Sequence, residues 1–290
     1  MVASRLANPT ATKNALEASG LNPKYRFGQN FLINDAIVGK IIHLAEIQPG
    51  DKIVEIGPGL GTLTLGLINA DADVFAIEVD SEMYERLQTT NALTDAEKQH
   101  FFCINQDALK VKDKQILEFC QHESFKLVSN LPYSVAATVV LDYFKRFANM
   151  QSATVMVQSE VADRMAAEVG TKNYGAYTVK LAMYTEIAGK FKVSANNFMP
   201  PPRVESAVIR LNRKCAFDVN LLQKASKIAD AAFANRRKTI NNSVKNYFSS
   251  NPDIAVSVLE AFEKCNISTS LRAEKITPCQ FIDVAKASMI

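Results

Sequence analysis

Short apolar runs rich in β-branched residues alternate with helical patterns along residues 51–158 of this 290-residue chain. The runs lie at residues 53–56, 74–79, 101–104, 126–129 and 154–158. The helical patterns between them lie at residues 60–69, 81–91 and 135–147. Strands that alternate with helices form parallel sheets covered on both faces, and continuously apolar runs are typical of strands buried on both sides. The alternation therefore predicts an α/β fold built on a parallel sheet.

The pattern changes beyond the fifth predicted strand. A β-rich stretch at residues 188–194 and another at residues 204–211 flank a proline cluster at residues 200–202. Runs of this length and composition are typical of strands. We expect the two stretches to form a late β-pair that adds an antiparallel edge to the sheet.

Helical patterns dominate the C-terminal part of the chain. They cover residues 219–247 and 252–288, and turn signals stand at Asn-Pro and Thr-Pro pairs. We therefore predict two domains. Residues 1–214, which include an N-terminal segment at residues 1–30, form the α/β domain, and residues 215–290 form a small all-helical domain.

Composition argues against several classes of protein. No stretch reaches the roughly 18 continuous apolar residues of a membrane span. Residues 1–20 lack the apolar core of a secretory signal, although their low acid content leaves a transit peptide as an alternative. The five cysteines are odd in number and none form a C-x-x-C pair, and the three histidines are scattered. We therefore expect a cytoplasmic protein with neither a disulfide framework nor a metal site.

Positive charge is concentrated in one part of the chain. Residues 200–247 hold ten Lys and Arg residues against three acidic residues, although the net charge of the whole chain is only +3. A basic block on a nearly neutral protein indicates a polyanionic partner. A solvated helical face explains the same charges, so charge alone leaves both interpretations open.

A glycine-rich loop follows the first predicted strand and opens the first predicted helix. It contains Glu55, Gly57, Gly59 and Gly61 in an E-x-G-x-G-x-G pattern. Glycines let the chain turn sharply and let a ligand lie against bare backbone. The dinucleotide fingerprint G-x-G-x-x-G fits poorly, because Thr62 occupies its last position. The pattern is instead similar to the first motif of S-adenosylmethionine-dependent methyltransferases.

Acidic residues follow the next two predicted strands. Glu78 ends the second strand, where a carboxylate can accept both hydroxyls of a ribose. Asp80 beside it suits the capping of the following helix. Asp107 follows the third strand and could accept a hydrogen bond from an adenine amino group, although an ordinary turn residue is the alternative. Because parallel strands end at one edge of a sheet, these acids and the glycine loop predict one shared binding site.

The sequence Asn130-Leu131-Pro132-Tyr133 follows the fourth predicted strand, at the same edge. The Asn130 side-chain oxygen and the Leu131 carbonyl could accept both N–H bonds of an adenine N6 and favour a tetrahedral nitrogen. Pro132 would make this turn rigid, and Tyr133 would offer a flat face for the base. Phe198 is a candidate for a second flat face. The alternatives are an Asn-Pro turn with a core tyrosine and plain loop packing of Phe198.

Other short motifs complete the set: Gly28-Gln29-Asn30-Phe31-Leu32, residues 200–204, and Asn235-Arg236-Arg237-Lys238-Thr239. Together the motifs resemble those of the ribosomal RNA adenine N6,N6-dimethyltransferases, most closely the bacterial small-subunit members. The resemblance runs from about Tyr25 to the C-terminus. It implies a Rossmann-like S-adenosylmethionine-dependent methyltransferase fold with catalysis in residues 1–214 and rRNA binding in residues 215–290.

The resemblance also implies a reaction, a cofactor and partners. Two methyl groups go from S-adenosylmethionine to each of two adjacent adenosines, in a hairpin loop near the 3′ end of 16S rRNA in the immature 30S subunit. The enzyme is expected to be monomeric and to need no metal, DNA or membrane. The implied cofactor-binding residues are Asn30, Leu32, Glu55, Gly57, Gly59, Glu78, Asp107 and Asn130. The implied catalytic residues are Asn130, Leu131, Pro132, Tyr133 and Phe198. The implied RNA contacts are Arg203, Arg236, Arg237 and Lys238.

Three alternatives stay open on the sequence. A sister enzyme that dimethylates one adenosine of 23S rRNA shares these motifs, but the long helical C-terminal segment favours the small-subunit enzyme. A non-catalytic nucleic-acid-binding homologue would not need both the glycine loop and the Asn130 motif. A DNA adenine methyltransferase usually carries an acidic residue in place of Asn130.

Overall fold

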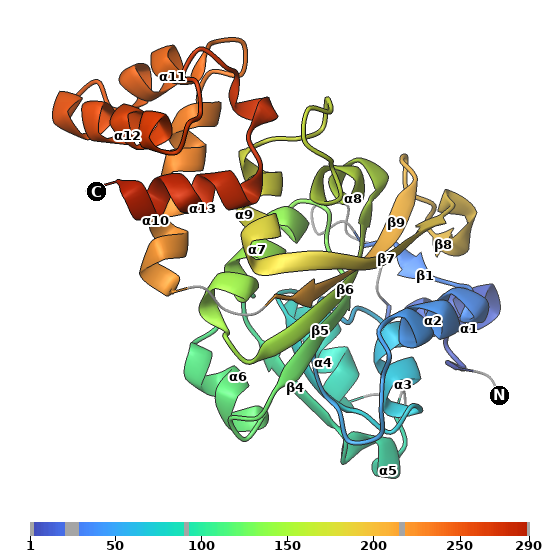
Figure 1. Cartoon of the computed structure of the whole chain (residues 1–290). Helices are drawn as coiled ribbons and strands as arrows, with labels where there is room; N and C mark the ends of the chain where they lie inside the picture. Colours follow the sequence, from blue (N-terminus) through green and yellow to red (C-terminus); the bar gives the residue numbers. More distant parts are fainter. Residues whose placement is uncertain (1–2, 21–28, 90–92, 215–217, 289–290) are drawn as a thin grey trace. The chain divides into compact units, whose positions relative to one another are not determined.

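The computed structural model describes residues 3–20, 29–89, 93–214 and 218–288. The chain divides into two compact units (Figure 1). The first comprises Met1–Ala162 and Ile187–Arg213, and the second comprises Asp163–Glu186 and Lys214–Ile290. Gly28, Cys215 and residues 25–27 lie outside the described residues, so the structure does not address the predictions made for them.

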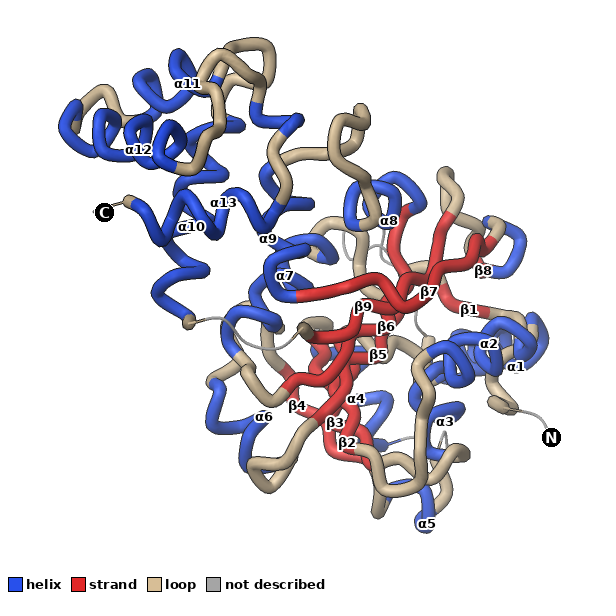
Figure 2. The backbone as a smooth tube through the Cα atoms, viewed as in Figure 1, coloured by secondary structure: helices blue, strands red, loops and turns tan. Residues whose placement is uncertain are grey.

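Among the described residues, a seven-stranded sheet forms the centre of the first unit, with its strands in the order β4-β3-β2-β5-β6-β9-β7 (Figure 2). Its strands are β2 (Lys52–Ile56), β3 (Asp73–Glu78), β4 (Phe101–Asn105), β5 (Phe125–Asn130), β6 (Met150–Gln158), β7 (Thr185–Val193) and β9 (Ser206–Arg213). Strands β2 to β6 pair in parallel, whereas β9 runs antiparallel to β6. The α/β prediction and the antiparallel late strand are both confirmed.

Burial along the strands follows their position in the sheet. The central strand β2 is buried from Ile53 to Ile56, as its mostly apolar run predicts, and this burial includes Glu55. The prediction of burial on both sides is wrong for β4, where Phe102 is 51% exposed. The reason is that β4 lies at the sheet edge and pairs only with β3 in the described sheet. Phe102 instead makes an edge contact with Phe119 at 5.5 Å between ring centroids.

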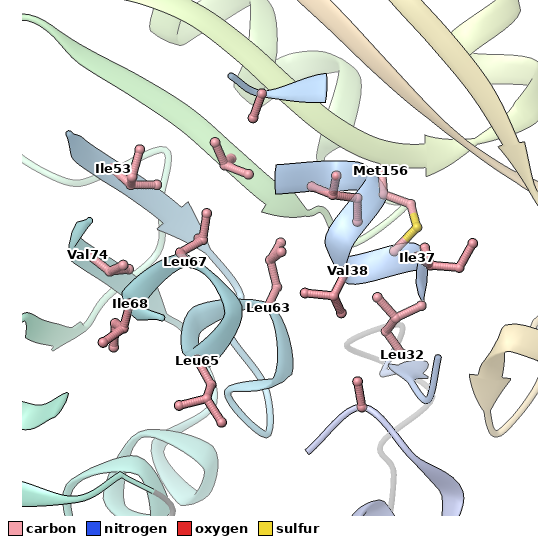
Figure 3. Packing of buried hydrophobic residues seen from close by; sticks show 14 of the residues in the cluster. Leu32, Ile37, Val38, Ile53, Leu63, Leu65, Leu67, Ile68, Val74 and Met156 are labelled. Carbon is pink, nitrogen blue, oxygen red and sulfur yellow. The ribbon is translucent and has the colours of Figure 1, made fainter. Parts of the chain in front are cut away.

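Helices and short segments of the first unit surround the sheet. They are α1 (Pro9–Ser19), α2 (Asp35–Leu44), α3 (Thr62–Ile68), α4 (Ser81–Thr89), α5 (Asp95–Lys98), α6 (Asp113–Phe119), α7 (Ala136–Arg146) and η2 (Ala195–Asn197); α8 (Ser159–Met165) continues into the second unit. The main apolar cluster joins α2 and α3 to the sheet, and Figure 3 shows Val38 and Leu63 pointing toward one another within it. A Cβ on Gly66 would lie 2.5 Å from Val38 Cγ1, so the small residue permits this close helix packing.

A two-stranded sheet links distant parts of the first unit. Strand β1 (Phe31–Leu32) pairs antiparallel with β8 (Phe198–Met199), and Leu32 lies opposite Phe198. The Asn34 side chain extends the link, since its Nδ2 donates to Asn197 Oδ1 at 2.7 Å. This pairing holds the N-terminal motif beside the cavity described below.

The second unit is helical. It contains α9 (Ala176–Tyr184), α10 (Val219–Phe233), α11 (Ile240–Tyr247), α12 (Pro252–Lys264), η3 (Ala273–Lys275) and α13 (Pro278–Ala287). The predicted helix at residues 219–247 is interrupted, because α10 ends at Phe233 and the Thr239 side chain caps α11 by accepting from Asn242 N. The Thr277 side chain caps α13 in a capping box with Gln280.

Residues 163–186 belong to the second unit, although the predicted division at residue 214 places them in the first. The reason is the packing of α9 among the C-terminal helices. Lys180 of α9 pairs with Asp230 of α10 at 2.7 Å, and the Tyr174 hydroxyl donates to the Ile276 carbonyl at 2.7 Å.

No helix in the described parts of the chain has both the length and the apolar character required to cross a membrane.

Candidate active site

A cavity of about 260 Å³ opens at the carboxyl ends of β2, β3 and β5. Open α/β sheets bind their ligands at this edge. The residues around it come from five separate segments. Among them are Asn30, Leu32, Glu55, Gly57, Gly59, Glu78, Asp107, Asn130, Leu131, Pro132 and Tyr133. The structure thus brings together every residue predicted to bind the cofactor, while their individual roles stay predictions.

The glycine loop has the left-handed backbone that its sequence predicts. Gly57 has φ +70° and Gly59 has φ +55°, a region that side chains other than glycine rarely adopt. A Cβ on Gly59 would lie 3.2 Å from Phe31 Cε1. Bare backbone therefore lines this side of the cavity, which allows a ligand to lie directly against it.

Glu78 lies at the end of β3 and is 5% exposed. Its carboxylate accepts hydrogen bonds from Gly59 N at 3.3 Å and Asp80 N at 2.9 Å. Burial raises the pKa of this carboxyl, although the two amide hydrogen bonds act in the opposite direction. Asp80 Oδ1 accepts from Glu82 N at 3.2 Å, which confirms the interpretation of Asp80 as a helix cap. Glu78 is thus held by the glycine loop at the cavity.

Glu55 lies one strand further along the same edge and is 1% exposed. The Thr64 hydroxyl of α3 donates to its Oε2 at 2.6 Å. Burial raises the pKa of Glu55 to about 8, and the nearby Glu78 adds to this rise, whereas the Thr64 hydrogen bond opposes it. Glu55 is therefore mostly a neutral acid at pH 7, which lowers the negative charge at the floor of the cavity.

The raised pKa of Glu55 gives a prediction for stability. Between its ordinary value near 4.5 and the folded value of about 8, Glu55 ionises in the unfolded chain but stays protonated in the folded one. The free energy of unfolding therefore falls as pH rises through this window, by on the order of 5 kcal/mol. We expect the Glu55→Gln variant to lack this fall, measured as the difference in Tm from the wild type between pH 5 and pH 8.

The exposed helix residue Glu118 provides the control for this measurement. A Glu118→Gln variant removes a carboxylate of α6 that lies in solvent, and its Tm should follow the pH dependence of the wild type. If Glu55→Gln and the wild type lose Tm in parallel as pH rises, Glu55 does not stay protonated in the folded protein.

Sequence reasoning missed several residues around the cavity. Val79 and Leu109 are exposed apolar side chains that border it beside Glu78 and Asp107. The sequence pattern that could have identified them is an apolar residue one or two positions after the acidic residue that ends or follows a strand. Gln29 also borders the cavity, and its Nε2 donates to Asp80 Oδ2 at 2.9 Å.

Asn130 ends β5, and its carboxamide is oriented by the N-terminal motif. Its Nδ2 donates to the main-chain carbonyl of Asn30 at 3.4 Å. This contact orients the carboxamide, and its oxygen is the atom that can accept from a substrate. Leu131 N donates to Met156 O at 3.1 Å, and the Pro132 carbonyl accepts from Val135 N at 3.1 Å where α7 begins. The acceptor pair predicted from the sequence is therefore set in a hydrogen-bonded turn.

The two aromatic residues predicted to hold a base lie in different environments. Tyr133 borders the cavity, and burial raises the pKa of its hydroxyl. Phe198 is 3% exposed and packs in the main apolar cluster with Leu32 and Met156. It is not among the residues around the cavity, because its pairing in β8 turns it into the core. Phe198 thus lies in an apolar cluster in this structure, and its role as a second flat face for the base stays a prediction.

The residues present fit S-adenosylmethionine. The bare glycine backbone and the Glu78 carboxylate suit a ribose, and Val79 and Leu109 suit the faces of an adenine. Thr62 also borders the cavity, and its Oγ1 is buried without a hydrogen-bond partner in the described structure. This hydroxyl is closed off from the cavity, so the fit rests on the glycine backbone, Glu78, Val79 and Leu109.

The four predicted RNA contacts are all exposed, but they differ in the hydrogen bonds that they make within the protein. Arg203 is exposed between β8 and β9 in the first unit. In the second unit, the Arg236 guanidinium donates to the carbonyls of Lys172 and Tyr174 and lies 3.9 Å from Glu274. Arg236 thus joins a loop to the C-terminal helices, and because its side chain is still 49% exposed, its contact with RNA stays a prediction. Arg237 and Lys238 are exposed.

Fold and site together define the class of S-adenosylmethionine-dependent methyltransferases, in which that cofactor is the methyl donor. A dimethyladenosine transferase from Plasmodium falciparum shares the fold with a TM-score of 0.71 and 23% identity, over 88% of this chain and 95% of that one. The 23S rRNA methyltransferase ErmE does so with a TM-score of 0.63 and 22% identity, over 89% and 99% of the two chains. Residues 20–288 match the family described as ribosomal RNA adenine dimethylase, and the chain belongs to this family.

Relatives of higher identity agree with this assignment. The "Ribosomal RNA small subunit methyltransferase A" of Bifidobacterium longum subsp. infantis is 37% identical over 282 residues, covering 93% of this chain and 89% of the relative. The protein of the same name from Malacoplasma penetrans is 38% identical over 251 residues, covering 87% and 86%. The chain is thus an S-adenosylmethionine-dependent rRNA adenine N6-dimethyltransferase.

Proposed function

We propose that this enzyme dimethylates the N6 atoms of two adjacent adenosines in a hairpin loop near the 3′ end of 16S rRNA, within the immature 30S subunit. We further propose that it acts as a monomer in the cytoplasm. The name of the relatives that are 37% and 38% identical, which refers to the small subunit, supports this substrate. The observation that carries the chemistry is the Asn130 carboxamide, which is oriented by the Asn30 carbonyl at 3.4 Å beside the glycine loop.

The chemistry follows from the two acceptors at this turn. An adenine N6 lone pair is delocalised into the ring and is a poor nucleophile. The Asn130 Oδ1 and the Leu131 carbonyl accept its two N–H bonds, which favours a tetrahedral nitrogen with its lone pair directed toward the cofactor side of the cavity. Bound S-adenosylmethionine supplies an electrophilic methyl group on a sulfonium. Positioning and preorganised dipoles carry the catalysis.

Removal of the amino proton does not require a strong general base in the active site. The amino proton becomes acidic once nitrogen has bonded to the methyl carbon, so it can leave to water without a strong base. Tyr133 presents its ring at the cavity, and stacking of a base on such a ring contributes roughly 1–3 kcal/mol. The residues around the target therefore act mainly by holding the adenine in place.

Transfer of radiolabelled methyl groups to purified immature 30S particles and to naked 23S rRNA tests the substrate. We expect label in the 30S particles only. Primer extension should detect two adjacent modified adenosines in rRNA of the parent strain and none in rRNA from a deletion strain. Label confined to 23S rRNA would contradict the proposed substrate. Absence of transfer to any RNA, with cofactor binding intact, would indicate a non-catalytic homologue.

The exposed basic pair of the second unit gives a prediction for rRNA binding. A double charge reversal, Arg237→Glu with Lys238→Glu, should weaken binding to 30S particles and reduce the slope of log K against log salt. Each lost phosphate contact lowers that slope by about 0.7–0.9. Filter binding between 50 and 300 mM salt would measure the change, and an unaltered Tm would show that the unit stays folded.

Two variants separate binding from folding in this experiment. Lys112→Glu with Lys114→Glu makes a matched double charge reversal at exposed positions at the start of α6 and should retain the salt slope of the wild type. Arg236→Ala should lower Tm, because it removes the hydrogen bonds to the Lys172 and Tyr174 carbonyls. Retained affinity with the same salt slope after the double reversal would place the rRNA contacts elsewhere.

A further inference from the structure

The side chain of Tyr133 is held at both ends. Its main chain follows Pro132 in the turn that opens α7, and its hydroxyl lies 2.7 Å from Ser206 Oγ. The two residues are 73 positions apart in the sequence. Since Tyr133 borders the cavity, the hydroxyl contact limits how far the long axis of its side chain can swing there.

Ser206 belongs to a rigid part of the sheet. It is the first residue of β9, is 0% exposed, and lies opposite Gln158 in the β6–β9 ladder. The main chain beside it is also bonded, because Ser159 N donates to Glu205 O at 2.9 Å. A buried hydroxyl on a paired strand has little freedom, so it is a fixed point against which a neighbouring ring can be oriented.

We propose that Ser206 is a positioning residue for adenine methylation. Its hydroxyl fixes the direction in which the Tyr133 side chain extends, and the target adenine stacks on that ring without touching Ser206. A ring already held in the stacking orientation loses less freedom when the base binds, and it keeps N6 aligned with the acceptors at Asn130 and Leu131. This inference rests on the stacking role of Tyr133 in the proposed function.

A double-mutant cycle on Ser206 and Tyr133 tests the proposal. Ser206→Ala and Tyr133→Phe each remove one partner of the hydrogen bond and leave the ring in place. We expect each to lower kcat/KM for 30S particles by about three- to tenfold, the range for one hydrogen bond. The double variant should be no worse than either single variant, and the Kd for the cofactor, measured by calorimetry, should stay unchanged.

A purely structural role for Ser206 gives a different result. Ser206→Ala would then lower Tm with little change in kcat/KM, or its effect would multiply with that of Tyr133→Phe. Ser152→Ala is the matched control, because Ser152 is also buried in the β6–β9 pair and lies opposite Asn212 at the far end of the ladder. This control should keep the kcat/KM of the wild type.

Two further variants keep the test decisive if Ser206→Ala fails to fold. Ser206→Thr and Ser206→Val are equal in size, but only threonine keeps the hydroxyl, so threonine should retain more activity. Equal activity of the two, or wild-type kcat/KM in Tyr133→Phe, would overturn the proposal. Absence of methyl transfer to 30S particles by the wild type would instead contradict the proposed function, which distinguishes the two failures.

Discussion

The Asn130→Ala variant is expected to lose methyl transfer almost completely while it still binds the cofactor. Removal of one preorganised hydrogen-bonding group from a reaction centre typically lowers kcat by about 10²- to 10³-fold. The alanine variant loses the acceptor for one N–H bond of N6, and it also loses the contact with the Asn30 carbonyl. Single-turnover transfer to 30S particles measures the loss, and calorimetry should find cofactor affinity only partly reduced.

Asn69 offers a matched control for this change. It is an exposed carboxamide after α3, and its Nδ2 donates to the Ala3 carbonyl at 3.0 Å. Asn69→Ala therefore removes a comparable side-chain hydrogen bond outside the cavity, and its rate should equal that of the wild type. Unchanged turnover in Asn130→Ala would rule out the proposed pair of acceptors. Loss of cofactor binding together with turnover would place Asn130 in cofactor binding instead.

The Glu78→Ala variant is expected to have the second largest effect, on cofactor affinity. In the proposed role the carboxylate accepts both ribose hydroxyls, and hydrogen bonds to a charged group contribute about 1.5–3 kcal/mol each. We expect the Kd for S-adenosylmethionine to rise by about 10²-fold, measured by calorimetry. The change also leaves Gly59 N and Asp80 N without their acceptor, so the glycine loop should lose part of its support.

Glu78→Gln separates the loss of the cofactor contact from the loss of loop support. Glutamine retains one oxygen that can accept from a loop amide, but it cannot accept from two hydroxyls with equal strength. Its Kd should lie between those of the wild type and the alanine variant, and its Tm should stay near that of the wild type. An alanine variant with the Kd of the wild type would show that Glu78 serves the loop alone.

Much of the fold could be predicted from local pattern. The runs that became β2, β3 and β5 are mostly apolar without strict alternation, and central strands of a covered parallel sheet are buried on both faces. The antiparallel strand β9 also follows from its β-rich composition. The break between α10 and α11 was missed, because the helical pattern continues through residues 234–239 while Thr239 starts a new helix by capping it.

The candidate site was predictable to the extent that it follows the sheet edge. Glu78, Asp107 and Asn130 each stand where a parallel strand ends, and strands of one sheet place such residues side by side. Phe198 was not predictable in this way. A position near Pro200 in the sequence does not determine where the Phe198 side chain points. The pairing of β8 with β1 directs that side chain into the apolar core.

By itself the sequence determined the order of strands and helices, the left-handed glycine loop and the residue types at the sheet edge, since these depend on local conformational preference and apolar periodicity. Tertiary structure alone decided which partners the polar side chains found. Examples are Thr64 for Glu55, the Lys172 and Tyr174 carbonyls for Arg236, and Ser206 for Tyr133. Most of these partners are far apart along the chain, so only packing brings them within hydrogen-bonding distance.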